Sequence, residues 1–310
     1  MKTLPQGIQD YLALRRALGF QFNHVEALLK QFVSFLQEKG APRMSPELMI
    51  EWAKQPVHTQ SAHWAKRLGI VRDFAQYWKS VDPQVELPAL GVLPYRYRRP
   101  TPYIYQETEI KSLLQASSFL QPQDGLRKHT YFTLIGLIAV AGLRIREPIA
   151  LNREDVDFSQ GIITVRKSKF GKSRLVPLDA STMKQLRRYA QVRDRFHSEL
   201  LNPAFFVSDR GTRVTKDSVR WAFIEMSKRS GLRKPSDRHG PRIHDLRHSF
   251  AVRTLLDWYR AGLNIDQHMP VLSTYFGHDH PSDTYWYLSA VPELFSIAGK
   301  RLEKHMGGVL

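Results

Sequence analysis

The sequence predicts a mainly helical protein with a small antiparallel β-sheet, organised in two domains. Apolar residues recur at helical spacing through roughly the first 95 residues. A segment with four prolines and no helical period at 87–102 is typical of an extended linker. Further along, three short segments alternate between apolar and polar residues with the period of strands. A chain of 310 residues is long enough for two domains.

The first domain is predicted over residues 1–90 as a bundle of four helices. One apolar stripe runs over 25–36 and ends before a glycine. Ser-Pro-Glu at 45–47 predicts a helix start, because serine caps helices well and proline is tolerated at the first helical position. Another stripe runs over 64–78 and ends before Asp-Pro. These patterns leave a polar, partly basic face on each helix.

Basic side chains of this domain and of the linker, placed at 91–104, are candidates for contact with a phosphate backbone. We expect exposed side chains at Lys66 and Arg67. We also expect a basic strap formed by Arg96, Arg98 and Arg99, which are interleaved with Tyr95 and Tyr97. A merely solvated surface is the competing interpretation for each of them.

The second domain is predicted over 105–310 and contains the sheet. Helices are expected at 106–116 and 129–141, strands at 155–158, 161–165 and 174–178, and further helices at 180–198, 215–230, 244–262, 267–275 and 291–304. The turn between the last two strands carries Lys167, Lys169 and Lys172.

The charge balance favours a polyanionic partner. Lys and Arg total 46 against 29 acidic residues, for a net charge of +17. Before Gln106 there are 14 basic and 8 acidic residues, and after it 32 and 21, so both parts are basic. The sequence has no cysteine, no secretory signal and no apolar run long enough for a bilayer. We therefore expect a cytoplasmic, DNA-associated protein that contains no disulfide.

Two arginines in the second domain are suited to hold one phosphate diester. Arg144 follows a Gly-Leu break at the start of a helix, and Arg247 lies one helical turn after His244. Guanidinium groups match phosphate oxygens bidentately and stabilise the charge that develops on them during phosphoryl transfer. The HxxR spacing alone is a weak signal, and ordinary surface residues are the alternative interpretation.

Tyr287 is the candidate nucleophile. A phenol has a pKa near ~10 and needs a cationic site or a base to attack at neutral pH. Tyr285 lies two residues earlier, so on a helix the two rings point to opposite sides, and we expect Tyr285 to pack in the core.

Proton transfer has several candidate groups. Lys169 at the hairpin tip suits a general acid for the departing oxygen, although the residues alone do not separate it from Lys167 and Lys172. His278 follows a glycine break and suits a hydrogen bond to a phosphate oxygen, although a lone histidine is more often structural. No step in this chemistry requires a metal or a cofactor.

Four stretches together resemble the tyrosine recombinase (phage integrase) family. They are AGLRIREPIAL at 141–151, KSKFGKSRLVPL at 167–178, HDLRHSFA at 244–251 and YFGHDHPSDTYWYL at 275–288. The resemblance implies a catalytic set of Arg144, Lys169, His244, Arg247, His278 and Tyr287, with Glu147 in support. It selects Tyr287 over Tyr285, because the family's tyrosine stands nine residues after the histidine. Pro148 departs from the family pattern, and we expect only a local adjustment there.

The resemblance also implies the architecture and the activity. The N-terminal part is similar to a helical core-binding (SAM-like) domain, and the second part to a tyrosine recombinase catalytic domain that closes with it around double-stranded DNA. The expected enzyme is a site-specific recombinase, encoded by a mobile element, that acts through a 3′-phosphotyrosine intermediate. We expect a monomer or dimer when free and a homo-tetramer, or an assembly with related recombinases, on two duplexes. The terminal helix at 291–304 packs on a neighbouring subunit or on its own domain.

Two other functions remain open at this point. A topoisomerase-like enzyme would use the same residues to nick and reseal DNA of any sequence. A non-catalytic DNA-binding or directionality factor would need neither the tyrosine nor the lysine.

Overall fold

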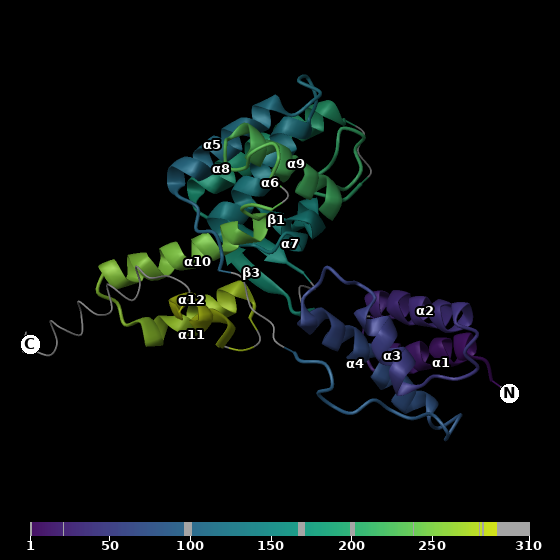
Figure 1. Cartoon of the computed structure of the whole chain (residues 1–310). Helices are drawn as coiled ribbons and strands as arrows, with labels where there is room; N and C mark the ends of the chain where they lie inside the picture. The colour runs from purple at the N-terminus through teal and green to yellow at the C-terminus, as the bar shows by residue number, and fades with distance from the viewer. Residues whose placement is uncertain are drawn as a thin grey trace, which may run out of the picture. The chain divides into compact units, whose positions relative to one another are not determined.

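The computed structural model describes residues 2–20, 22–95, 101–166, 171–198, 202–237, 239–278, 280 and 282–289. The chain divides into two compact units, Met1–Pro100 and Thr101–Leu310 (Figure 1). The helix expected at 291–304 lies outside the described residues.

The described residues of the N-terminal unit form four helices. They are α1 (Leu4–Ala17), α2 (Asn23–Glu38), α3 (Pro46–Lys54) and α4 (Ser61–Trp78). As the Ser-Pro-Glu pattern predicts, the Ser45 side chain caps α3 by accepting the backbone N–H of Leu48 at 3.3 Å. The apolar stripes meet in one core, where Phe32, Trp52 and Phe74 are all buried.

The C-terminal unit contains the remaining elements. They are α5 (Glu107–Gln115), the 3₁₀ helix η1 (Ala116–Phe119), α6 (Arg127–Ala141), α7 (Arg146–Ala150), the 3₁₀ helix η2 (Arg153–Asp155), β1 (Val156–Asp157), β2 (Ile162–Val165), β3 (Arg174–Pro177), α8 (Ala180–Phe196), α9 (Lys216–Arg229), α10 (Ile243–Arg260), α11 (Ile265–Phe276) and α12 (Ser282–Ser289). The strands form an antiparallel sheet in the order β1-β2-β3. The predicted fold class, mainly helical with a small antiparallel sheet, is confirmed. Pro148 lies in the first turn of α7, where proline costs little.

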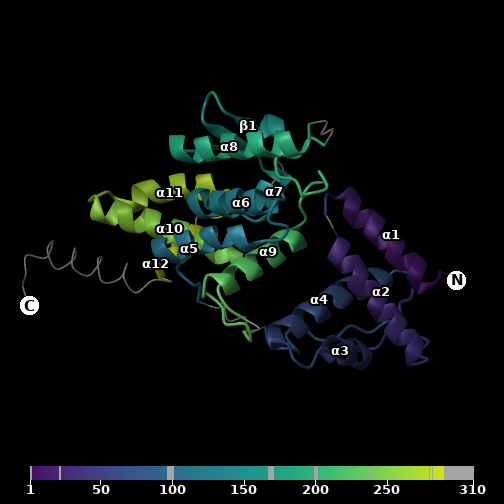
Figure 2. The ribbon, with the colours of Figure 1, turned by 90° about the horizontal axis from the view of Figure 1, so that it is seen from above.

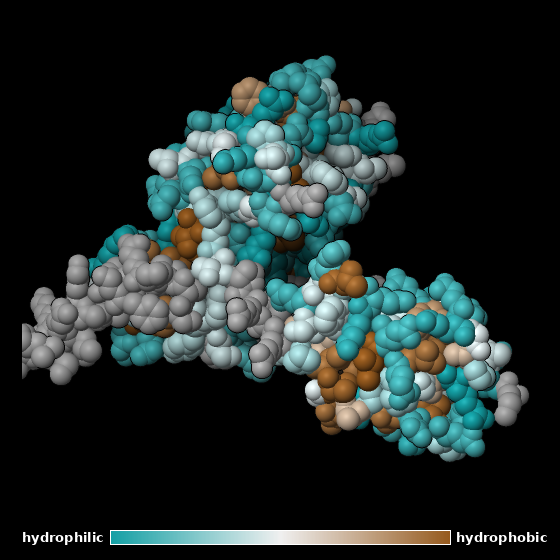
Figure 3. All heavy atoms as spheres, viewed as in Figure 1, coloured by the Kyte–Doolittle hydropathy of each residue, from teal (hydrophilic) through white to brown (hydrophobic). Residues whose placement is uncertain are grey.

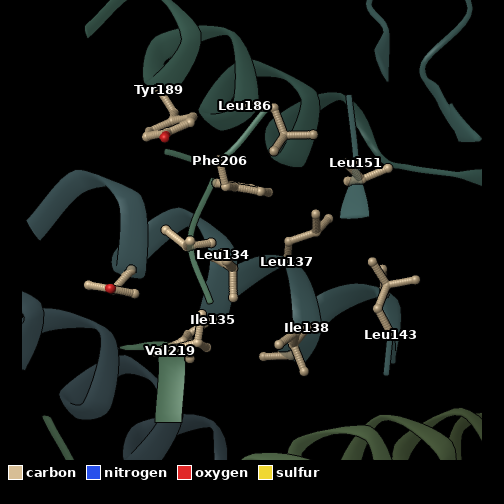
Figure 4. Close-up of a cluster of buried hydrophobic side chains, with 14 of the residues drawn as sticks. Leu134, Ile135, Leu137, Ile138, Leu143, Leu151, Leu186, Tyr189, Phe206 and Val219 are labelled. Atoms are coloured by element: carbon tan, nitrogen blue, oxygen red, sulfur yellow. The ribbon is translucent and has the colours of Figure 1, made fainter. Parts of the chain in front are cut away.

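The main core of this unit forms around α6. Figure 4 shows Leu134, Ile135, Leu137 and Ile138 of this helix among apolar side chains contributed by α8 and α9. All four are almost fully buried. Burial of most of its residues explains why α6 reads as an apolar run with no polar stripe, although Val140 near its end is exposed.

A second apolar cluster joins α10, α11 and α12. Figures 1 and 2 show these three helices beside one another. The cluster includes Leu255, Met269, Phe276 and Tyr287. It therefore connects the helix of the HxxR motif to the helix of the candidate nucleophile.

The face drawn in Figure 3 is mainly hydrophilic, although some apolar side chains gather over the N-terminal unit. Within the part of the chain that the structure describes, no helix has the length and apolarity needed to cross a membrane.

Candidate active site

Arg144 lies in the short connection between α6 and α7. Gly142 ends α6 with φ 59°, and a Cβ there would lie 2.6 Å from the rings of Phe250 and Phe276, so both conformation and space require glycine. The chain then directs Arg144 at the C-terminal end of α11. Its Nη1 donates to the carbonyl oxygen of Phe276 and its Nη2 to that of Gly277, both at 3.1 Å.

Glu147 is a buried carboxylate shared by two arginines. It accepts the backbone N–H of Arg144 at 2.9 Å and Nη1 of Arg144 at 3.2 Å. Both terminal nitrogens of Arg174 also donate to it, at 3.0 and 2.9 Å. Burial alone would raise the pKa of Glu147, but the hydrogen bonds and charge of Arg174, with the Arg144 N–H, outweigh it and hold the pKa below its ordinary value. The carboxylate is therefore ionised and fixes both guanidinium groups.

Arg174 is a site residue outside the predicted catalytic set. It begins β3, and besides Glu147 it reaches the carbonyl oxygen of Tyr275 through Nε at 2.7 Å. It thus joins the sheet, α7 and α11. One signal for it was present: Arg174 shares a strand face with the buried Val176, and a charge on a core-facing position needs a buried partner.

Arg247 is almost fully buried, with 1% of its surface exposed. Nη1 donates to the carbonyl oxygen of Gly142 at 2.7 Å and Nη2 to that of Phe276 at 2.9 Å, while the guanidinium lies 4.2 Å from the centroid of the Phe276 ring. Burial, reinforced by the charge of Arg144, lowers the pKa of Arg247 to about 10, so it remains a cation at neutral pH. The two catalytic candidates therefore converge on the end of α11.

His278 follows α11 directly and faces Arg247. Its Nε2 lies 3.1 Å from Nη2 of Arg247, and its Nδ1 lies 2.7 Å from the hydroxyl of Thr284 in α12. His278 thus joins the arginine pair to the helix that carries Tyr287.

His244 stands in the first turn of α10, one turn before Arg247. The residue as a whole is exposed, yet its ring is partly desolvated and packs against His248 at 4.6 Å between centroids. This desolvation and, to a smaller extent, the positive charge of Arg247 lower the pKa of His244 to about 4. The imidazole is therefore neutral at pH 7.

Tyr287 is buried, with 2% of its surface exposed. Its ring lies 6.0 Å from that of Phe276, 6.4 Å from His278 and 5.4 Å from His248, centroid to centroid. Tyr285 does point to the opposite side, but the prediction that it packs in the core is wrong. It is 40% exposed, and its hydroxyl lies 3.4 Å from an oxygen of Asp266 in α11.

The predicted DNA contacts of the N-terminal unit divide into two kinds. Lys66 on α4 is exposed, as expected. Arg67 was expected to be exposed and is instead buried, with its guanidinium 3.8 Å from the centroid of the Trp52 ring and its Nη2 donating to the Trp52 carbonyl oxygen at 3.1 Å. Arg67 is therefore a packing residue between α3 and α4.

Several candidates lie outside the described residues. They are Lys167, Lys169, Arg96, Arg98 and Arg99. Lys172, just before β3, is described and exposed.

A family model adds the deciding comparison. The model of the phage integrase family matches residues 104–293, which is more than half of the chain and spans every element of the site above. The chain belongs to this family. A member of the phage integrase family is a tyrosine recombinase, an enzyme that transfers DNA strands.

Curated relatives in the family resemble nearly the whole chain. The protein named "Putative integrase/recombinase y4rB" from Sinorhizobium fredii is 42% identical over 309 residues, 98% of each chain. A "Tyrosine recombinase" from Thermosipho africanus is 32% identical over 302 residues, 97% of this chain and 92% of that one.

Solved structures share the fold at lower identity. The XerH site-specific recombinase in a post-cleavage complex with a palindromic difH substrate has a TM-score of 0.63 at 17% identity, covering 92% of this chain and 78% of that one. The Tn1549 transposon integrase in complex with transposon right end DNA has a TM-score of 0.63 at 15% identity, covering 96% and 98%. The fold that the chain shares with these structures therefore extends over both units.

Proposed function

We propose that this chain is a site-specific recombinase in which Tyr287 attacks a scissile phosphate of double-stranded DNA. The bond between phosphorus and the phenol oxygen forms as the bond to the 5′-oxygen breaks, which leaves a 3′-phosphotyrosine and a free 5′-hydroxyl. The bond energy is retained, so a 5′-hydroxyl of another strand reverses the step without ATP. The supporting observation is that Arg144, Arg247 and His278 converge on the end of α11, against which the Tyr287 ring packs.

The arginines stabilise the transition state in this proposal. Arg144 and Arg247 bind the non-bridging oxygens of the scissile phosphate, where charge develops as the phosphorane forms. Glu147 and Arg174 hold Arg144 in place through the carboxylate that the two arginines share. Because this network exists without DNA, the orientation of Arg144 costs little at the moment of reaction.

Proton transfer completes the chemistry. The imidazole of His244, which is neutral because its pKa is lowered to about 4, assists the transfer of the phenol proton. Lys169 donates a proton to the departing 5′-oxygen. His278 binds a phosphate oxygen.

We propose that the N-terminal unit and the linker bind the DNA backbone while the C-terminal unit acts on it. The net charge of +17 supports contact with a polyanion, and Lys66 and Lys172 are exposed. In the linker, Arg96, Arg98 and Arg99 stay candidates, as does Lys167 in the hairpin. The assembly proposed is a tetramer on two duplexes, and a mobile element is the proposed genetic context.

The test uses a suicide DNA substrate, nicked near the cleavage point and taken from the DNA that flanks the gene. Wild-type protein is expected to form a covalent adduct that survives a denaturing gel, and Tyr287→Phe to bind the same DNA without forming it. Tyr285→Phe is the matched control and keeps the adduct, because Tyr285 points away from the site. An adduct with Tyr287→Phe would refute the nucleophile.

Two other outcomes separate the alternatives. Specific binding with no adduct for wild-type protein indicates a DNA-binding factor. Relaxation of supercoiled plasmid of any sequence, without recombinant products, indicates a topoisomerase-like enzyme.

A further inference from the structure

The ring of His278 is held at both nitrogens. A guanidinium group donates hydrogen bonds and accepts none, so the 3.1 Å contact with Nη2 of Arg247 makes Nε2 of His278 the acceptor. Neutral His278 therefore carries its proton on Nδ1, which donates to the Thr284 hydroxyl at 2.7 Å. In the absence of DNA, the tautomer of His278 is set by these two partners.

Thr284 is placed to act on the histidine and on the nucleophile helix together. Its side chain is fully buried, with 0% exposure, so water does not readily replace it. It lies three residues before Tyr287 in α12, and residues at this spacing share a helix face. The hydroxyl bond is therefore a direct connection between the end of α11 and the helix that carries the phenol.

We infer that Thr284 is a positioning residue for DNA cleavage. Its hydroxyl keeps the imidazole ring of His278 in place whichever ring nitrogen carries the proton. This inference rests on the proposed function. To bind a phosphate oxygen, Nε2 of His278 must change from accepting a hydrogen bond from Arg247 to donating one to the phosphate. Nδ1 then either gives up its proton and accepts the Thr284 O–H, or keeps it and donates as an imidazolium. A hydroxyl serves as donor or acceptor, so Thr284 satisfies Nδ1 in every one of these states.

The test compares two substitutions of Thr284. Thr284→Val keeps the branched shape and removes the hydroxyl, whereas Thr284→Ser keeps the hydroxyl. We expect the valine variant to form adduct on the suicide substrate about 10- to 100-fold more slowly than wild type. Removal of a whole general acid or base slows a reaction by about 10²- to 10⁴-fold, and loss of a group that only positions one should cost no more than the lower end of that range. The serine variant should stay within about threefold of wild type, and both should bind DNA as wild type does.

A double-mutant cycle separates positioning from simple packing. If Thr284 acts through His278, then Thr284→Val costs nothing further in a His278→Ala background, so the two losses are not additive. Equal losses in both backgrounds, or a serine variant as slow as valine, would overturn the inference. The thermal unfolding temperature of each variant is measured in parallel, so that a folding defect is recognised. If Thr284→Val is defective, Thr284→Ala, which also lacks the hydroxyl, takes its place in the cycle.

The same experiment distinguishes a failure of this inference from a failure of the proposed function. If wild type forms no adduct, the proposed function fails before Thr284 is tested. If wild type is active and Thr284→Val cleaves at the same rate, only the role of Thr284 is refuted.

Discussion

Replacing Glu147 with glutamine tests whether one carboxylate holds the arginine network together. The carboxylate accepts four hydrogen bonds, two from Arg174 and two from Arg144. Glutamine has nearly the same volume but only one acceptor oxygen, and its NH₂ group would face donors. The substitution therefore breaks a buried ion pair while leaving two neighbouring guanidinium groups without a counter-charge.

The expected loss of stability follows from the burial of this network. The side chains of Glu147 and Arg174 are 4% and 10% exposed. Two charged hydrogen bonds of about 1.5–3 kcal/mol each are lost, and breaking a buried pair costs about 3–5 kcal/mol. We therefore expect a loss of about 3–5 kcal/mol. For a unit of this size, each 1 kcal/mol lowers the unfolding temperature by about 2–4 °C, so the expected decrease is roughly 10 °C.

Differential scanning calorimetry resolves such a change, and Glu154→Gln is the matched control. The Glu154 carboxylate is 70% exposed and lies 3.8 Å from Arg166, a geometry worth about 0–1 kcal/mol. Its unfolding temperature should stay within about 2 °C of wild type. Equal decreases for the two variants would show that burial of the Glu147 pair does not determine its contribution.

The pH dependence of Glu147→Gln has a definite sign. The folded protein holds the pKa of Glu147 below the ordinary value of 4.5, so the carboxylate stabilises the fold fully above that value. The contribution is lost as the pH falls through the lower, folded-state pKa. The difference between wild type and variant should thus be constant near neutral pH and shrink below about pH 4. A difference that persists undiminished at pH 2 would contradict this assignment.

Three further predictions concern the site and the N-terminal unit. In an NMR titration of the DNA-free protein, His244 should titrate near its lowered pKa of about 4, and a value near 6.5 would contradict its desolvation. Lys66→Ala should weaken DNA binding and reduce its salt dependence, whereas Arg67→Met should lower the unfolding temperature and leave DNA affinity unchanged, because Arg67 is buried against α3. Tetranitromethane should nitrate Tyr285 faster than Tyr287 in DNA-free protein, since the two are 40% and 2% exposed, and equal rates would show that α12 opens readily.

Local signals predicted most of the fold, and tertiary contacts account for the errors. The expected helix at 267–275 is observed as Ile265–Phe276, with the Asn264 side chain capping its first turn at 3.0 Å from the N–H of Asp266. Arg67 stands at helical spacing on the apolar face of α4, so the pattern itself indicated burial. Its residue type favoured the surface, and only the ring of Trp52, contributed by another helix, decides between them.

The catalytic candidates and the supporting Glu147 were found by motif, but Arg174 was not. Arg174 binds Glu147, which lies 27 residues earlier in the sequence, and the carbonyl oxygen of Tyr275, which lies 101 residues later. No spacing rule connects residues so far apart in sequence. Similarly, their helical spacing correctly placed Tyr285 and Tyr287 on opposite sides of the helix. We expected Tyr285 to be buried, but Tyr287 is the buried residue and Tyr285 is exposed. The apolar cluster around Phe276 determines that side, and it forms only when α10, α11 and α12 pack together.

The arginines of this site are anchored by main-chain carbonyl oxygens, and this affects how the enzyme tolerates mutation. Arg247 is held by the carbonyls of Gly142 and Phe276, and Arg144 by those of Phe276 and Gly277. Every amino acid supplies a carbonyl, so no side-chain replacement deletes these acceptors. Only a change in the path of the backbone does so, and both glycines have φ near 60°, where other residues are strained. Besides Glu147, the vulnerable positions for the placement of Arg144 and Arg247 are thus two glycines, which have no side chain.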